Sequence, residues 1–117
     1  MRRRLKIFKQ YDVVVVPFPF TDKLASKRRP AVVLSHRDAV GQGRSILAMV
    51  TSSEHDSWPN DTLILDIETA GLTVPCRIRF KLFTVDHELI IRTLGHLSKK
   101  DQMAVQKSLH NVFNIVN

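Results

Sequence analysis

The stretch YDVVVVPF at Tyr11–Phe18 decides the fold, because a run of valines between aromatic residues is typical of a buried β-strand. Pro17 and Pro19 are expected to end this strand, since proline has no N–H to donate to a sheet. A polar, basic loop follows at Thr21–Arg28, and the apolar run AVVLS at Ala31–Ser35 predicts a second strand. The chain therefore begins as a β-rich domain.

Further short apolar runs separated by turn residues continue this pattern. The predicted strands are Ser45–Thr51, Thr62–Ile67, one long or two short strands over Cys76–Phe80 and Lys81–Thr84, and Ile90–Leu94. Thr51 falls where a strand runs into a loop, and the polar loop Ser52–Asp61 is long enough to carry function. Short strands spaced by turns predict a small barrel or an α+β domain.

The C-terminal segment is predicted to be a helix. Ser98 has the character of an N-cap, and Asp101 three residues later fits a capping box. Apolar residues then recur at helical spacing, at Val105, Leu109, Val112, Phe113 and Val116. This stripe is expected to dock the helix on the barrel rather than to bind a partner.

Length and composition indicate one globular domain in a reducing compartment. The 117 residues are 44% hydrophobic and 25% charged, which suits a packed core and argues against global disorder. Cys76, the lone cysteine, has no partner for an internal disulfide. No apolar run reaches the roughly 20 residues of a membrane helix, and the run at Val13–Val16 is too short for a signal peptide. A cytoplasmic protein is expected.

The charge balance points to polyanions. Lys and Arg number 18 against 11 Asp and Glu, a formal charge of +7. Nucleic acid is the commonest polyanion in a cytoplasm. Two alternatives would explain the same excess of positive charge: a basic surface that serves only solubility, and an acidic protein partner.

Six phrases of the sequence, taken in order, resemble the MazF/PemK toxin family. They are Asp12–Asp22, Lys27–Ser35, Met49–Ser52, Gly71–Pro75, Phe83–Asp86 and Leu94–Ser98. The resemblance implies a mainly β fold, an SH3-like barrel of the MazF/PemK/CcdB type with a C-terminal helix, paired into a homodimer. It also implies the toxin of a type II toxin-antitoxin system that cleaves single-stranded RNA at short sequences, leaving a 2′,3′-cyclic phosphate and a 5′-hydroxyl. An acidic antitoxin would inhibit it, and operator DNA would be bound only through that antitoxin.

Two residues are expected to carry the cleavage chemistry. Arg29 directly precedes Pro30, the family's position for a catalytic arginine, and its guanidinium can fork two N–H groups onto a phosphate. Thr51 stands where the family has a catalytic Thr or Ser hydroxyl. The sequence contains no HExxH or CxxC cluster, so neither a metal nor another cofactor is expected.

Further residues are candidates for binding RNA. Phosphate or hydroxyl contacts are assigned to Lys27, Arg28, Ser52, Ser53, Arg77 and Arg79. Alternation places Arg77 and Arg79 on one face of a strand, and this face either contacts phosphates or is simply exposed to solvent. Trp58 and Phe20 are candidates for stacking on bases or for packing. Among five scattered histidines, His36 and His55 flank the strands of the proposed site, and Cys76 is interpreted as a packing residue.

The sequence departs from the family pattern at three places. Tyr11 stands where a glycine is usual, and residues 1–9 form a basic arm expected to be disordered or to bind RNA non-specifically, before a single domain at 10–117. The segment Arg77–Lys81 lacks the acid that some members carry two residues after an active-site arginine. Two alternatives stay open: a toxin of the same fold that poisons DNA gyrase, and an inert module that binds RNA or antitoxin.

Overall fold

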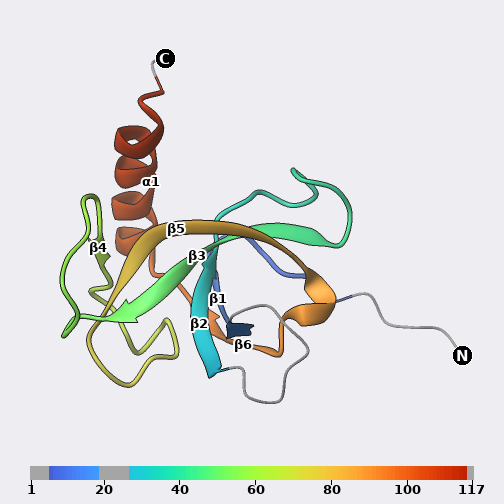
Figure 1. The fold of residues 1–117 in the computed structure, drawn as a ribbon, viewed down its shortest axis with the longest axis horizontal. Helices are drawn as coiled ribbons and strands as arrows, with labels where there is room; N and C mark the ends of the chain where they lie inside the picture. Colours follow the sequence, from blue (N-terminus) through green and yellow to red (C-terminus); the bar gives the residue numbers. More distant parts are fainter. Residues whose placement is uncertain (1–5, 19–26, 116–117) are drawn as a thin grey trace, which may run out of the picture.

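The computed structural model describes residues 6–18 and 27–115, which form one curled antiparallel sheet and a C-terminal helix (Figure 1). The six strands lie in the order β4-β5-β3-β2-β1-β6. Their bounds are β1 Asp12–Phe18, β2 Lys27–Val33, β3 Arg44–Ser52, β4 Thr62–Leu63, β5 Cys76–Asp86 and β6 Arg92–His96, with a short 3-10 helix η1 at His87–Leu89 and the helix α1 at Lys99–Phe113. The predicted mainly β fold with a C-terminal helix is confirmed. No helix in the described part of the chain is long and apolar enough to cross a membrane.

The valine run of β1 is buried on both faces of the sheet. Val13 and Val32 point into a first core that also contains Val105 of α1, whereas Val14 and Val33 point into a second core. Because successive side chains of a strand alternate between faces, a strand covered on both sides needs an unbroken apolar run. This explains why Val13–Val16 shows no polar alternation.

The start of α1 is fixed by two polar side chains. Ser98 is the N-cap, as predicted, and its Oγ accepts a hydrogen bond of 3.2 Å from the backbone N–H of Asp101. The Asp101 carboxylate, 1% exposed, accepts from the N–H groups of Leu65 at 2.9 Å and Asp66 at 3.0 Å. The acid therefore holds the segment after β4. The predicted strand Thr62–Ile67 is wrong beyond Leu63, because Asp101 takes the amides that a longer ladder would need.

The apolar stripe of α1 docks only in its first turns. Val105 is fully buried and Leu109 packs on the first core, as predicted. Val112 and Phe113 are 37% and 54% exposed, so the expectation that they dock is wrong. The helix lies beside β4 at one edge of the sheet and continues past it (Figure 1), which leaves its last turn without a surface to cover. Val116 lies outside the described residues.

Several other strand boundaries differ from the prediction, whereas the single strand β5 is one of the two forms predicted for its segment. β2 begins at Lys27, so Lys27 and Arg28 extend the strand rather than the loop. β5 is one long strand whose register with β3 shifts between Ala48 and Met49, a bulge that leaves Phe80 and Lys81 outside the pairing. The last strand is Arg92–His96 instead of Ile90–Leu94. Ile90 closes η1 through its N–H and points into the second core.

Tyr11 adopts a backbone conformation that favours glycine. Its φ is 73°, the left-handed region that costs a side chain roughly 1–2 kcal/mol. The Tyr11 N–H donates to Val33 O at 2.7 Å, its carbonyl accepts from Leu97 N at 3.0 Å, and its ring lies in the first core. These contacts hold the residue in the strained conformation just before β1.

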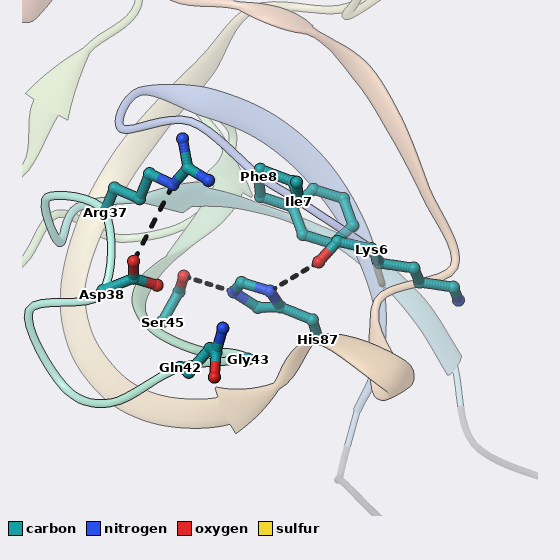
Figure 2. A pocket seen from close by; sticks show the side chains of 9 residues that line it. All are labelled: Lys6, Ile7, Phe8, Arg37, Asp38, Gln42, Gly43, Ser45 and His87. Atoms are coloured by element: carbon teal, nitrogen blue, oxygen red, sulfur yellow. Dashed lines mark hydrogen bonds and ion pairs between the residues drawn. The ribbon is translucent and has the colours of Figure 1, made fainter. Parts of the chain in front are cut away.

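The end of the basic arm contacts the sheet, and the arm's boundary at residue 9 stays a prediction. Phe8 is buried in the second core. His87 joins the two parts: its Nδ1 lies 3.0 Å from the carbonyl of Lys6 and its Nε2 lies 2.7 Å from Ser45 Oγ (Figure 2). Since a carbonyl only accepts, the Nδ1 carries a proton. This network fastens Lys6–Phe8 beside the start of β3.

Candidate functional site

The candidate site lies where one face of three strands changes from apolar to basic. On β1, Phe18 follows Val14 and Val16 at alternate positions, and on β2, Arg29 precedes Ala31 at the same spacing. Val14, Val16 and Ala31 belong to the second core. Because alternate residues of a strand share a face, Phe18 and Arg29 continue that core at its open end.

The register of the sheet brings Arg29 and Thr51 together. β2 and β3 are antiparallel with Ala31 opposite Met49, and Arg29 and Thr51 each lie two residues beyond this pair on their strands. The pairing stops at Ala31, consistent with the missing N–H of Pro30. Both predicted catalytic residues line one cavity of about 290 Å³. The full lining is Phe18, Arg29, Met49, Val50, Thr51, His55, Trp58, Arg79 and Lys81.

Arg29 has no carboxylate partner within the part of the chain that the structure describes. Its guanidinium lies 6.0 Å from the ring centroid of Phe18, and the Lys81 ammonium lies 4.9 Å from the same centroid. The Nε of Arg29 is buried without a hydrogen-bond partner. Such a group is costly to bury unpaired. Among the described residues, no carboxylate neutralises the positive charge of Arg29.

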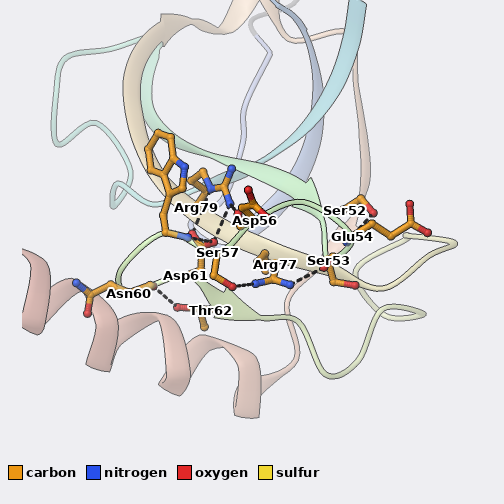
Figure 3. Close-up of polar contacts among 11 residues, drawn as sticks. Ser52, Ser53, Glu54, Asp56, Ser57, Asn60, Asp61, Thr62, Arg77 and Arg79 are labelled. Atoms are coloured by element: carbon orange, nitrogen blue, oxygen red, sulfur yellow. Dashed lines mark hydrogen bonds and ion pairs between the residues drawn. The ribbon is translucent and has the colours of Figure 1, made fainter.

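Arg79 is bound to the loop that follows β3. Its Nη2 lies 2.9 Å from Oδ2 of Asp61, with the two side chains 13% and 5% exposed, and it also donates to the Asp56 carbonyl (Figure 3). The guanidinium lies 4.6 Å from the ring centroid of Trp58, and the backbone N–H of Trp58 donates to Asp61 Oδ2 at 2.8 Å. The loop therefore closes around Arg79.

Arg77 anchors the same loop nearer to its start. It donates to the Ser53 carbonyl at 2.5 Å and to Ser57 Oγ (Figure 3). The predicted alternation is confirmed by the register, in which Arg77 is opposite Thr51 and Arg79 is opposite Met49. RNA binding by these arginines stays a prediction, and their described contacts are with the loop.

The ion pair with Arg79 changes the acidity of Asp61. Burial of the Asp61 carboxyl alone would raise its pKa, but hydrogen bonds from Arg79 and from the Trp58 N–H outweigh it. The positive charges of Arg79 and Arg77 act in the same direction, so the pKa lies below its usual value. Asp61 is therefore an ionised structural group and a weak base.

The other predicted RNA-binding residues lie around this cavity without lining it. Ser52 ends β3 and its Oγ accepts from the Glu54 N–H at 3.3 Å, while Ser53 contributes its carbonyl to Arg77. Lys27 is exposed at the start of β2. Arg28 lines a second cavity of about 350 Å³, and Arg29 and Arg92 line it as well. Arg29 thus lies between two basic cavities.

Several residues that line these cavities were not assigned to the site from the sequence. Phe18 and Lys81 follow from alternation, since each continues a spacing of two along its strand. The sequence indicated only that His55 flanks a strand. It gave no reason to assign Arg92 to the site, because only the pairing of β6 with β1 brings Arg92 there. Trp58 lines the cavity and its role in stacking stays a prediction, while Phe20 lies outside the described residues.

Cys76 and the potential metal ligands are unremarkable in this structure. Cys76 is buried in the first core, burial raises the pKa of its thiol, and Sγ donates to Val74 O at 3.2 Å. These contacts support the interpretation of Cys76 as a packing residue. Within residues 6–18 and 27–115, no group of three or more His, Cys, Asp or Glu side chains is arranged to hold a metal ion.

Comparison with known proteins gives a family and a fold. Residues 9–113 match a family described as the PemK-like, MazF-like toxin of type II toxin-antitoxin systems. No curated protein sequence matches the chain significantly.

Solved structures match over nearly the whole chain. The Mycobacterium tuberculosis toxin MazF-mt6 is 17% identical, with a TM-score of 0.70, covering 91% of this chain and 99% of that one. A MazE-MazF crystal structure from Deinococcus radiodurans is 18% identical, with a TM-score of 0.73 and coverages of 95% and 100%. An endoribonuclease in complex with its cognate antitoxin from a mycobacterial species is 9% identical, with a TM-score of 0.72 and coverages of 95% and 99%. At these identities the likeness shows the fold, which agrees with the predicted barrel.

Proposed function

Because the chain belongs to the PemK-like, MazF-like toxin family of type II toxin-antitoxin systems, we propose that it is an endoribonuclease. It cleaves single-stranded RNA without a metal ion at the cavity of Arg29 and Thr51, leaving a 2′,3′-cyclic phosphate and a 5′-hydroxyl. The observation that carries the proposal is the shared cavity: Arg29 and Thr51, from different strands, line it together with Arg79 and Lys81.

The reaction needs positioning and charge stabilisation more than covalent chemistry. The 2′-hydroxyl attacks the neighbouring phosphorus, and negative charge grows on the phosphoryl oxygens. Arg29 donates two N–H groups to these oxygens and stays charged throughout. The hydroxyl of Thr51 on the facing strand donates to a phosphoryl oxygen or holds the attacking 2′-oxygen.

The second cavity extends the binding surface for the RNA backbone. Arg28 and Arg92 lie on its wall, and Arg29 belongs to both cavities. A strand crossing Arg29 places the neighbouring phosphate beside Arg28 and Arg92. Trp58, 46% exposed at the first cavity, offers a ring on which an unpaired base stacks. The formal charge of +7 supports binding of a polyanion.

An acidic antitoxin competes for this same surface in our proposal. One of the matched structures is an endoribonuclease with its cognate antitoxin, and another is a MazE-MazF structure. We also propose that the protein is a cytoplasmic homodimer. It binds operator DNA only through the antitoxin. The charge of the two cavities favours an acidic segment as the inhibitor.

The proposal is tested by incubating the protein with a long single-stranded RNA in EDTA and mapping the chemical ends of the products. Discrete cuts ending in cyclic phosphate are expected, lost in Arg29→Ala and Thr51→Ala and largely kept in Thr51→Ser. Arg37→Ala is the matched control, since Arg37 is exposed and lines neither cavity. A folded wild type that binds RNA and does not cut it would contradict the enzyme proposal and favour the inert binding module or the gyrase poison.

A further inference from the structure

The proposed reaction requires a group that accepts the proton of the 2′-hydroxyl, and the described lining of the cavity contains no carboxylate. We propose that His55 is this general base. The inference rests on the proposed ribonuclease function. It also accounts for the missing acid in the segment Arg77–Lys81.

A turn at the end of β3 places His55 at the cavity that Thr51 also lines. It follows Thr51 by four residues, its backbone N–H donates to the Ser52 carbonyl at 3.2 Å, and the residue lines the cavity. Ser52 Oγ accepts from the neighbouring Glu54 N–H. The turn therefore starts where β3 ends.

Arginine contacts fix the backbone on both sides of His55. Before it, the Ser53 carbonyl accepts from Arg77; after it, the Asp56 carbonyl accepts from Arg79 and Ser57 Oγ accepts from Arg77 (Figure 3). A loop anchored at these three residues gives the backbone of His55 a defined position, from which its imidazole can reach the cavity.

The other polar groups that line the cavity are poor bases. Guanidinium groups such as those of Arg29 and Arg79 stay protonated, and a lysine ammonium like that of Lys81 is protonated near neutral pH. The hydroxyl of Thr51 is far too weak a base. Imidazole is the side chain that exchanges a proton between about pH 5 and 8, and His55 is the one histidine among the described residues that line this cavity.

Acidic side chains near the loop do not take this role. Asp61 is bound to Arg79 and does not line the cavity. Glu54 and Asp56 flank His55 on its own loop, but both are exposed and outside the lining. The charged residues that line the cavity together with His55 are thus Arg29 of β2 and Arg79 and Lys81 of β5.

The proton and electron changes balance within the proposed step. The O2′–H bond breaks and its proton moves to the neutral imidazole of His55, while the oxygen's electron pair forms the O2′–P bond. The P–O5′ bond breaks, its electron pair stays on O5′, and O5′ takes a proton from water. The imidazolium then returns its proton to the hydroxide so formed. No oxidant, reductant or net water is consumed.

Single-turnover cleavage of a short single-stranded RNA, measured in EDTA between pH 5 and 9, tests the inference. The wild-type rate is expected to rise about tenfold per pH unit over the acidic part of the range and then level off. His55→Gln should cut about 100-fold more slowly or worse, and lose the acidic rise, at unchanged RNA affinity. His36→Gln is the control, because His36 is also exposed and does not line the cavity.

A second variant separates catalysis from loop structure. His55→Ala should recover cleavage when free imidazole is added, whereas Arg29→Ala should not. A His55→Gln rate within about threefold of wild type, or an unchanged pH profile, overturns the role of His55 and leaves the ribonuclease proposal standing. The absence of cleavage by folded wild type overturns both.

Discussion

The arginines on either side of Thr51 have opposite environments. Arg29, on β2, is without a described carboxylate partner, and its guanidinium is left to the cavity. Arg77 and Arg79, on β5, are bound to the loop between β3 and β4 through Asp61, Ser57 and backbone carbonyls. We infer from this difference that Arg77 and Arg79 hold the loop, whereas Arg29 is available to bind a ligand.

The largest expected effect is the loss of cleavage when Arg29 is removed. Arg29→Ala should lower the cleavage rate by about 10³-fold, the scale for removing a charged group that stabilises a transition state. Arg29→Lys should recover part of the rate, because an ammonium supplies charge without the forked geometry. Single-turnover kinetics measures both. If Arg29→Lys and Arg29→Ala both cleaved RNA like wild type, the proposed role of Arg29 in cleavage would be contradicted.

Removal of Arg79 should instead destabilise the fold. Arg79→Ala leaves the Asp61 carboxylate buried without its cation, a change that costs about 3 kcal/mol in other proteins. The thermal midpoint should fall by about 10 °C, measured by circular dichroism. The double variant Asp61→Ala/Arg79→Ala should be less destabilised than the sum of the single variants. Additive effects would mean that the ion pair does not hold the loop.

The pH dependence of stability is a second test of the ion pair between Asp61 and Arg79. The pKa of Asp61 is lower in the folded protein than its usual value. Its ionisation therefore contributes stability above the unfolded-state pKa of about 4, and this contribution is lost as the pH falls through the lower folded value. The free energy of unfolding of wild type should drop in this acidic range. Asp61→Asn should show a smaller drop, with the remaining dependence including Asp66, whose pKa is also lowered by Thr69.

The smallest expected effect concerns the second cavity. Arg92→Ala or Arg28→Ala should weaken RNA binding by about tenfold, and each should reduce the slope of log affinity against log salt by roughly one phosphate contact. The rate of the bound complex should stay near that of wild type. Fluorescence anisotropy with a labelled RNA at several salt concentrations measures this. An unchanged salt slope would remove the second cavity from the RNA path.

The fold was largely predictable because local signals and packing agree. The valine run Val13–Val16 and the cap at Ser98 each formed the expected element. The predicted strand Thr62–Ile67 was too long because a distant side chain, Asp101, takes the amides of Leu65 and Asp66. No local sequence pattern predicts a contact of Asp101 with residues so far away in the sequence.

The candidate site was predictable in its residues and less so in its contacts. Arg29 and Thr51 were singled out by motif, and the structure adds that both line one cavity. Alternation placed Arg77 and Arg79 on one face, but their partners depend on how residues 53–61 fold back over β5. These contacts between residues 53–61 and β5 form only in the tertiary structure, so the periodicity of the sequence could not predict them.

The central claim, that Arg29 serves RNA while Arg79 serves the loop, is tested most directly by measuring two quantities on the same samples. Cleavage rate in EDTA and thermal midpoint are recorded for wild type, Arg29→Ala and Arg79→Ala. We predict that Arg29→Ala loses cleavage at a wild-type midpoint, and that Arg79→Ala shows a clearly lowered midpoint. An Arg29→Ala protein that unfolds as readily as Arg79→Ala, or that still cleaves RNA at the wild-type rate, would contradict the claim.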